Sequence, residues 1–272
     1  MDHALPSDWL VPQWPAPAGV RAVFTTRSGG TSAAPFDSMN LGAHVGDAPE
    51  AVAANRTRLA QITGAQAVFL DQVHGVRTLV LDASSGDGQQ ADACVTARRK
   101  LACTAMVADC LPVLLTTQEG RVVAAAHAGW RGLAGKGRSS GVLEEVHASF
   151  SALAQQVQGY AAIKTIAWLG PCIGPSAFEV GAEVKAAFEA AQPEAGRCFV
   201  PAGPGKYLAN LPALARLRLQ ALGVAQIYGN DGSAPWCTAG NPSRFFSHRR
   251  DASLCGNGFG TTGRMAACIW LD

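Results

Sequence analysis

Three apolar runs in this chain each end at a side chain that can bind a transition metal. The side chains are His74 in residues 72–75, Cys110 in residues 108–112 and His127 in residues 126–132. Sheets often present functional groups where their strands end, because the core holds the backbone while the adjoining loop leaves the side chain accessible. We therefore expect the three side chains to converge.

Two imidazoles and one thiolate are the nitrogen and sulfur donors that zinc prefers. Three protein ligands would leave a fourth position for water or substrate, which is the arrangement of a catalytic rather than a structural zinc. The wide spacing of the three residues along the chain is not that of a zinc finger. Taken singly, each residue has a structural alternative, as a buried histidine with one backbone partner or as a core cysteine.

The same residues permit a chemistry without metal. Cys110 could act as a nucleophile, with His127 as its base and with Asp109 or His74 orienting that base. A thiolate paired with an imidazolium needs no metal. Two histidines that converge on one sulfur favour the metal, because a thiolate nucleophile needs only one histidine.

The elements that would position these residues can be predicted from apolar runs bounded by Gly, Pro, Asp or Asn. The predicted strands cover residues 20–26, 67–70, 76–81, 101–107, 113–116, 122–126, 163–169 and 265–271. Apolar residues at helical spacing predict helices over residues 49–62, 140–153, 177–190 and 211–222. Surface loops are expected at residues 202–205 and 255–263.

Several predicted strands follow one another directly across residues 101–126, whereas helices gather in the second half of the chain. This order predicts an α+β (mixed α/β) fold, in which mixed β-sheets are flanked by helices. No internal repeat or long linker divides the sequence. We expect residues 1–272 to form a single catalytic domain, with an extended N-terminal segment over residues 1–19.

Composition excludes several classes of protein. Hydrophobic residues make up 48% of the chain and charged residues 15%, which excludes a disordered protein. The net charge of +2 gives no electrostatic case for nucleic-acid binding. We find neither a signal peptide nor an apolar stretch of spanning length, so we expect no membrane association and a cytoplasmic location. The eight cysteines are scattered singly and are expected to be free thiols.

The three metal-competent segments resemble, in order and spacing, the signature blocks of one family. It is variously called polyphenol oxidase (laccase) domain proteins, purine nucleoside phosphorylases of the adenosine-active type, and peptidoglycan editing factors. Further similar blocks, from about Phe24 to the C-terminus, lie at residues 25–30, 39–42, 170–174, 179–181, 245–251 and 262–264. The chain departs from the family pattern at Phe178 and His248, where the family usually has Tyr, and at Asn210-Leu211, where it has Asp-Leu.

The resemblance implies that His74, Cys110 and His127 are the ligands of a catalytic zinc ion and the catalytic residues. The implied activities are phosphorolysis of adenosine, inosine, guanosine and methylthioadenosine, and deamination of adenosine. The partners would then be a small-molecule nucleoside and phosphate, and we expect the protein to be a monomer.

Three alternatives compete with this interpretation. One is a Cys/His amide hydrolase that edits peptidoglycan precursors by removing a wrongly incorporated L-Ser. Another is a copper-dependent polyphenol oxidase, since soft and imidazole ligands also accept copper, although six histidines cannot supply a four-copper centre. The last is a binding protein with a structural zinc, in which the fourth coordination position would be filled.

Four residues are candidates for binding the substrate. Arg131 lies in a glycine-rich turn followed by Lys136, which could cradle phosphate or could be an ordinary tight turn with a carboxylate partner. Arg27, in another glycine-containing turn, has the same two interpretations. Asn40 and Gln72 could hydrogen-bond a purine edge or could cap loops.

Two further features of the sequence have a structural explanation as well as a functional one. Arg249, Arg250 and Arg264 form a basic set near the C-terminus, for which surface ion pairs are favoured over substrate contact. Trp130 is expected to pack in the core, although an aromatic ring beside a base-binding pocket could stack on the base.

Overall fold

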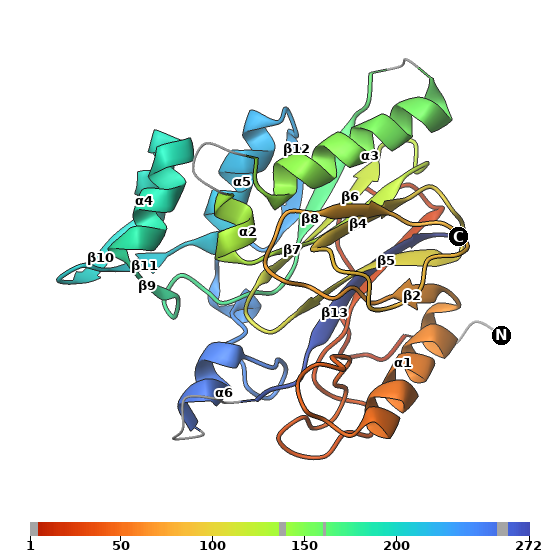
Figure 1. Cartoon of the computed structure of the whole chain (residues 1–272), viewed down its shortest axis with the longest axis horizontal. Helices are drawn as coiled ribbons and strands as arrows, with labels where there is room; N and C mark the ends of the chain where they lie inside the picture. The colour runs from red at the N-terminus through yellow and green to blue at the C-terminus, as the bar shows by residue number, and fades with distance from the viewer. Residues whose placement is uncertain (1–4, 136–139, 160–161, 255–260) are drawn as a thin grey trace.

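The centre of the molecule is a six-stranded mixed sheet (Figure 1). The structure is a computed structural model that describes residues 5–135, 140–159, 162–254 and 261–272. Its strands, in spatial order, are β12 (Gln226–Gly229), β8 (Thr165–Leu169), β6 (Leu111–Thr117), β7 (Val123–Ala128), β4 (Ala93–Thr96) and β3 (Thr78–Val80). The four inner strands run antiparallel to one another, and each outer strand is parallel to its neighbour. β6 and β7 are buried along their whole length, as expected from their Leu, Val and Ala content.

A four-stranded sheet packs against one face of the six-stranded sheet. Its spatial order is β1 (Val20–Phe24), β13 (Met265–Leu271), β5 (Leu101–Val107) and β2 (Gln66–Val68). Successive side chains of a strand point to opposite faces. In β13, Met265, Ala267 and Ile269 accordingly join the core between the sheets, whereas Ala266 and Cys268 join the core beneath α1 (Pro49–Thr63). The result is a helix–sheet–sheet–helix stack.

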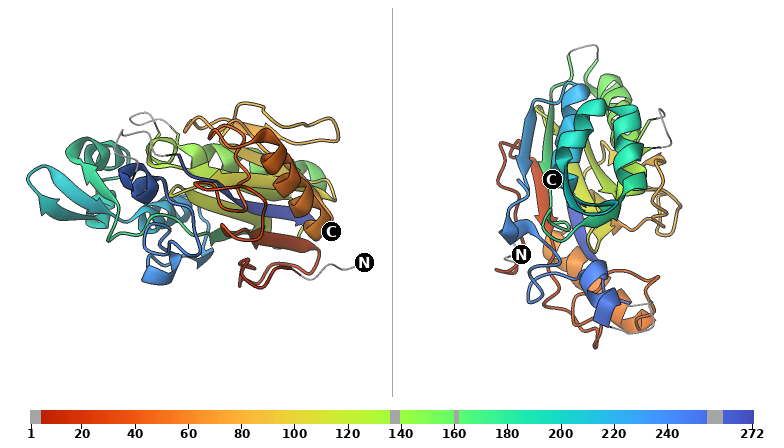
Figure 2. Two further views of the ribbon diagram at one scale, coloured as in Figure 1. Left: turned by 90° about the horizontal axis from the view of Figure 1, so that it is seen from below. Right: turned by 90° about the vertical axis from the view of Figure 1, so that its left-hand side faces the viewer.

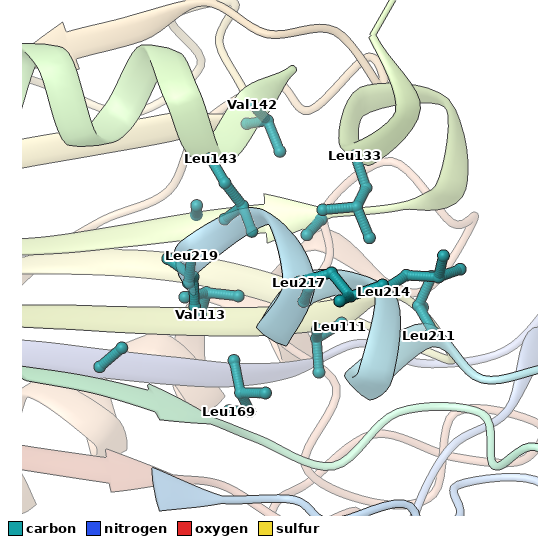
Figure 3. Close-up of a cluster of buried hydrophobic side chains, with 14 of the residues drawn as sticks. Leu111, Val113, Leu133, Val142, Leu143, Leu169, Leu211, Leu214, Leu217 and Leu219 are labelled. Carbon is teal, nitrogen blue, oxygen red and sulfur yellow. The ribbon is translucent and has the colours of Figure 1, made fainter. Parts of the chain in front are cut away.

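Helices α3 (Val142–Gln158) and α5 (Leu211–Ala221) cover the other face of the six-stranded sheet, beside the short α2 (Trp130–Ala134) (Figure 1). Figure 3 shows the leucine side chains of α5 gathered over Leu111 and Val113 of β6 and Leu169 of β8. Because Leu111 directly follows Cys110, this buried cluster holds the point at which the Cys110 loop enters the sheet.

A small antiparallel sheet lies at the end of the molecule opposite to the C-terminus (Figures 1 and 2). Its strands are β10 (Phe199–Gly203), β11 (Lys206–Ala209) and β9 (Glu179–Gly181), and it packs with α4 (Ala182–Ala191). The remaining elements are two 3-10 helices, η1 (Pro193–Cys198) and η2 (Ala234–Trp236), and the helix α6 (His248–Leu254).

The predicted mixed α/β class, with mixed sheets flanked by helices, is confirmed, and each predicted strand overlaps an observed one. The helix predicted over residues 177–190 begins later, at Ala182, because the residues before it pair with β11 as strand β9. The short strands β4 and β9 to β12 were not predicted. Residues 202–205 lie at the β10–β11 turn, and residues 255–260 of the other predicted loop lie outside the described residues.

The described part of the expected N-terminal segment, from residue 5 onward, is attached to the four-stranded sheet. Leu10 exchanges backbone hydrogen bonds with Phe24 at the end of β1, and the Trp9 side chain is buried. Within the described ranges, no helix combines the length and the apolar character that crossing a membrane requires.

Substitution of Asn55 by alanine should destabilise the fold. This buried side chain on α1 accepts a hydrogen bond from the Thr31 amide and donates to the Asn40 carbonyl, so it ties the 31–40 loop to the helix. Leaving the Thr31 amide and the Asn40 carbonyl without their hydrogen-bond partner should lower the free energy of unfolding by about 2–3 kcal/mol. Urea denaturation would measure the loss, with the exposed Thr57→Ala on the same helix as the matched control. Equal stability of the two variants would contradict this account.

Candidate metal centre and its cavity

His74, Cys110 and His127 lie together at one end of the six-stranded sheet. Cys110 immediately precedes β6, and His127 lies on β7 opposite Pro112, so the pairing of these strands brings the two side chains together. His74 approaches from the loop between β2 and β3. The potential ligand atoms of the three residues lie within 4.8 Å of one another, and Cys110 Sγ is 3.6 Å from His74 Nε2.

The three side chains differ in exposure. His74 is exposed, Cys110 is half-buried and His127 is buried. Among the described residues, this is the one cluster of three or more His, Cys, Asp or Glu side chains close enough to share a metal ion. The arrangement can therefore hold an ion that is supported from the core and reached from one side.

Asp92, directly before β4, is the residue that organises this cluster, and it was not singled out from the sequence. Its Oδ1 atom lies 2.9 Å from His127 Nδ1. Asp92 fixes the ring of His127 and leaves Nε2 as the nitrogen available to a metal or to the Cys110 sulfur. The sequence did carry a signal for Asp92, since it is a lone acidic residue between Ala91 and the largely apolar residues of β4. The structure shows that these neighbours are buried.

The same carboxylate also holds the loop that carries His74. Asp92 accepts hydrogen bonds from the backbone amides of Val73, His74 and Gly75, at 3.3, 2.9 and 2.7 Å. His74 has a φ of 58°, in the left-handed region that non-glycine residues seldom adopt. Three amide donors converging on one buried carboxylate stabilise this strained turn at the site.

Gly129 allows the chain after β7 to pass close to the cluster. A Cβ atom at this position would lie 2.6 Å from Cδ2 of His74 and 3.0 Å from Sγ of Cys110. At Gly132, one turn further, a Cβ atom would lie 2.6 Å from the carbonyl oxygen of Gly75. These glycines of the glycine-rich turn are thus required by close packing against the His74 loop.

The histidines turn Cys110 into an acidic thiol. Burial alone raises the pKa of Cys110, but His127 and His74 outweigh burial and lower this pKa to about 6. For His127, burial lowers the pKa, whereas Cys110 and Asp92 together raise it to about 9. At neutral pH the metal-free cluster therefore holds a thiolate beside an imidazolium, which is the protonation state of a reactive cysteine.

Asp109, the residue before Cys110, belongs to a different network. It has a φ of 90°, and its carboxylate accepts hydrogen bonds from the Thr238 and Ser247 hydroxyls and from the Arg249 amide. The carboxylate that orients His127 is Asp92, not Asp109. Asp109 instead attaches the Cys110 turn to the segment that leads into α6.

A cavity of about 370 Å³ opens beside the cluster. Its apolar wall comes from Trp130, Ile173, Phe178 and Leu211. Its polar lining includes the basic side chains His44, Arg131, His248, Arg249 and Arg264. The volume lies in the range of small-molecule sites, and the lining combines an apolar wall with basic groups.

Two of the four predicted substrate-binding residues, Gln72 and Arg131, line this cavity. The side-chain amide of Gln72 exchanges two hydrogen bonds with the backbone of Met106, so both of its polar atoms are engaged. Arg131 is exposed, and its guanidinium lies over the Trp130 ring, 4.5 Å from the ring centroid. Lys136, the other residue of the expected cradle, lies outside the described residues.

The other two, Arg27 and Asn40, do not line the cavity. Arg27 lines a separate surface depression, where it pairs with Asp37 and donates to the Pro242 carbonyl. Asn40 is fully buried. Its side chain donates a hydrogen bond to Asp47 and accepts one from the Arg264 amide. Two of the positions at which the chain departs from the family pattern, Phe178 and His248, do line the cavity.

Comparison with known proteins places this site in a family. A family model described as multi-copper polyphenol oxidoreductase laccase matches residues 21–272. The chain belongs to this laccase family. It is 49% identical over 265 residues to purine nucleoside phosphorylase PA4543 of Pseudomonas aeruginosa, covering 97% of this chain and 98% of that protein. It is 46% identical over 267 residues to purine nucleoside phosphorylase YfiH of Escherichia coli, covering 97% and 99%.

Solved structures of similar proteins share the fold of this laccase-family member. Protein NMB0706 of Neisseria meningitidis superposes with a TM-score of 0.85 at 44% identity, covering 98% of this chain and all of that one. YlmD from Geobacillus stearothermophilus superposes with a TM-score of 0.79 at 32% identity, covering 93% and 92%. The mixed α/β architecture is thus that of its relatives.

Replacing Asp92 with asparagine should weaken metal binding without removing a ligand. Loss of a carboxylate that orients a ligating histidine typically lowers metal affinity by about 10–100-fold. Competition with a chromophoric chelator would measure zinc affinity, with the exposed Asp87→Asn as the control. Zinc affinity equal to that of the wild type would show that Asp92 does not organise the centre.

Alkylation of Cys110 should follow its lowered pKa. The thiolate predominates above pH 6 and is lost as the pH falls through that value, so the iodoacetamide rate in metal-free protein should be half-maximal near pH 6. Cys255 lies outside the described residues, so the measurement uses a Cys255→Ser background. Bound zinc should suppress the reaction. A midpoint near pH 8.5, the value of an ordinary cysteine, would contradict the thiolate–imidazolium pair.

Proposed function

We propose that this protein is a zinc-dependent purine nucleoside phosphorylase with adenosine deaminase activity, acting on adenosine, inosine, guanosine and methylthioadenosine. The observation that carries the proposal is the meeting of His74, Cys110 and His127 beside a cavity large enough for a nucleoside. Relatives that align over nearly their whole length are named purine nucleoside phosphorylases.

The residues of the cluster fit a zinc ion. They offer two imidazole nitrogens and a sulfur, the Cys110 pKa favours the thiolate that zinc requires, and Asp92 directs Nε2 of His127 away from its own carboxylate. When bound, zinc supplies Lewis-acid chemistry at the open side of the cluster. A four-copper oxidase centre has no support, because the described residues contain one such cluster and the chain has six histidines.

The protein's own side chains would position the substrate in the cavity. The rings of Trp130 and Phe178, on the apolar wall, suit the faces of a purine base. The basic residues of the lining suit phosphate, the co-substrate of phosphorolysis. Gln72 has both polar atoms bound to Met106 and serves to hold the cavity wall, so we do not assign it to the base. A filled structural site is disfavoured because His74 is exposed.

A second candidate function rests on a specific observation, the chain of contacts from Cys110 through His127 to Asp92. A thiolate, an imidazole and a carboxylate in this order form the nucleophile, base and orienting group of a cysteine hydrolase. The corresponding activity is amide hydrolysis that removes L-Ser from a peptidoglycan precursor. It requires free Cys110, whereas the zinc mechanism requires Cys110 to be a ligand.

The expected partners follow from the leading proposal. They are a small-molecule nucleoside and phosphate, and neither nucleic acid nor a membrane is needed. A free thiol at Cys110 suits the expected cytoplasmic location, where cysteines stay reduced. We propose that the protein acts as a monomer.

Zinc-loaded protein incubated with adenosine and phosphate should form adenine and ribose 1-phosphate, and without phosphate should form inosine. Cys110→Ala should lose stoichiometric zinc and lower kcat/KM at least about a hundredfold, since even loss of an outer partner lowers activity 10–100-fold. Cys198→Ala, which does not line the cavity, is the control. Chromatography of the products and metal analysis provide the measurements.

The outcomes separate the candidates. Absence of adenine, hypoxanthine, inosine and ribose 1-phosphate from fully zinc-loaded protein would eliminate the leading proposal. Cleavage of UDP-MurNAc-L-Ser by metal-free protein, abolished by alkylation of Cys110, would support the hydrolase instead.

A further inference from the structure

Arg264 is a basic residue of the cavity for which the sequence favoured a surface ion pair over substrate contact. It lies directly before β13, half-buried, and lines the cavity that contains His74, Cys110 and His127. Only its Nη1 atom has hydrogen-bond partners in the described part of the chain, and these are the carbonyl oxygens of Thr262 and Gly263. In that part of the chain the Nε and Nη2 donors have no hydrogen-bond partner, so they can serve a ligand.

No carboxylate among the described residues forms an ion pair with Arg264. Two acidic residues of the neighbouring segments have their oxygens engaged elsewhere. Asp109 accepts from Thr238, Ser247 and the Arg249 amide, and Asp251 pairs with Arg250 and accepts from Thr262. Burial lowers the pKa of the Arg264 guanidinium, which reflects the cost of a charge without a close partner.

The surrounding structure is shaped around this arginine. Asn40 accepts a hydrogen bond from the Arg264 amide through Oδ1 and is itself held by Asp47. A Cβ atom at Gly42 would lie 2.7 Å from Cγ of Arg264, so the absence of a side chain there leaves room for the arginine stem. The N-terminal 40–42 segment therefore fixes Arg264 on the cavity wall.

Arg249 adds a second positive charge to this side of the cavity, and His44 adds an uncharged imidazole that can donate a hydrogen bond. His44, two residues beyond Gly42, lines the same cavity, and its pKa is lowered by burial and then by the Arg264 charge. Arg249 also lines the cavity and donates to the Glu179 carbonyl. The negative groups near Arg264 are Cys110 and Asp109; Cys110 would bind the metal, and Asp109 is already hydrogen-bonded.

We propose that Arg264, with His44 beside it, forms the anion subsite that holds the phosphate group in the cavity. This inference rests on the proposed function and assigns the phosphate to Arg264 in place of the Arg131 turn or Arg27. A guanidinium with two free donors matches two oxygens of a tetrahedral oxyanion. Inorganic phosphate and the phosphate group of a sugar phosphate share this chemistry.

The test is calorimetric titration of the zinc-loaded full chain with inorganic phosphate and, separately, with ribose 1-phosphate. Loss of a charge-assisted hydrogen-bonded pair should weaken binding at least about tenfold in Arg264→Gln. Arg264→Lys keeps the charge but loses the two parallel donors of the guanidinium. Its affinity for the anions should lie between those of Arg264→Gln and the wild type. Arg21→Gln removes an equal charge from the surface pair with Asp272, so it should bind like the wild type.

Zinc content and urea midpoints identify variants that fold, and if Arg264→Gln does not fold, Arg264→Lys decides the test. Binding of both anions that weakens only in the Arg264 variants supports the subsite. Phosphate affinity unchanged in a folded Arg264 variant, or no phosphate binding by wild type at millimolar concentration, overturns it. Binding that depends on Arg264 in a protein without nucleoside turnover would retain the subsite and reject the phosphorylase.

Discussion

The centre of this protein depends on the buried carboxylate of Asp92. It binds the ring of His127 and three consecutive amides of the His74 loop, so a single side chain sets the geometry of two potential ligands. A buried carboxylate is tolerated only when it is well bonded. Here its partners are the supports of the site, and its charge together with the Cys110 thiolate would balance that of a divalent ion.

The framework around this carboxylate explains why the cavity combines distant parts of the chain. Pairing of β6 with β7 sets Cys110 beside His127, the β4 start supplies Asp92, and the loop before β3 supplies His74. On the far side, residues 40–42 hold Arg264 at the entry to β13. Both β-sheets of the stack therefore contribute a wall.

Long apolar runs made the strands on each side of Cys110 and His127 predictable, and abrupt ends of these runs drew attention to both residues. The short strands β9 and β12 escaped prediction because partners far along the chain, rather than local pattern, decide whether such segments pair. β10 and β11 form a hairpin with each other, but β10 is largely exposed and lacks the apolar run that marks a buried strand. Asp92 carried a local signal, an acid within a buried run. Arg264 was noticed only as one of a basic set, since its role follows from the distant Asn40 and from the lack of an ion-pair partner among the described residues.

The unequal exposure of the two histidines sets a direction for metal exchange. His127 is locked in the core between Asp92 and β7, whereas His74 stands on a loop at the surface. Release of a bound ion would begin at the outer imidazole, with Cys110 and His127 as the remaining protein ligands. The lifetime of a metal-bound state would thus depend on how firmly Asp92 holds the left-handed turn at His74.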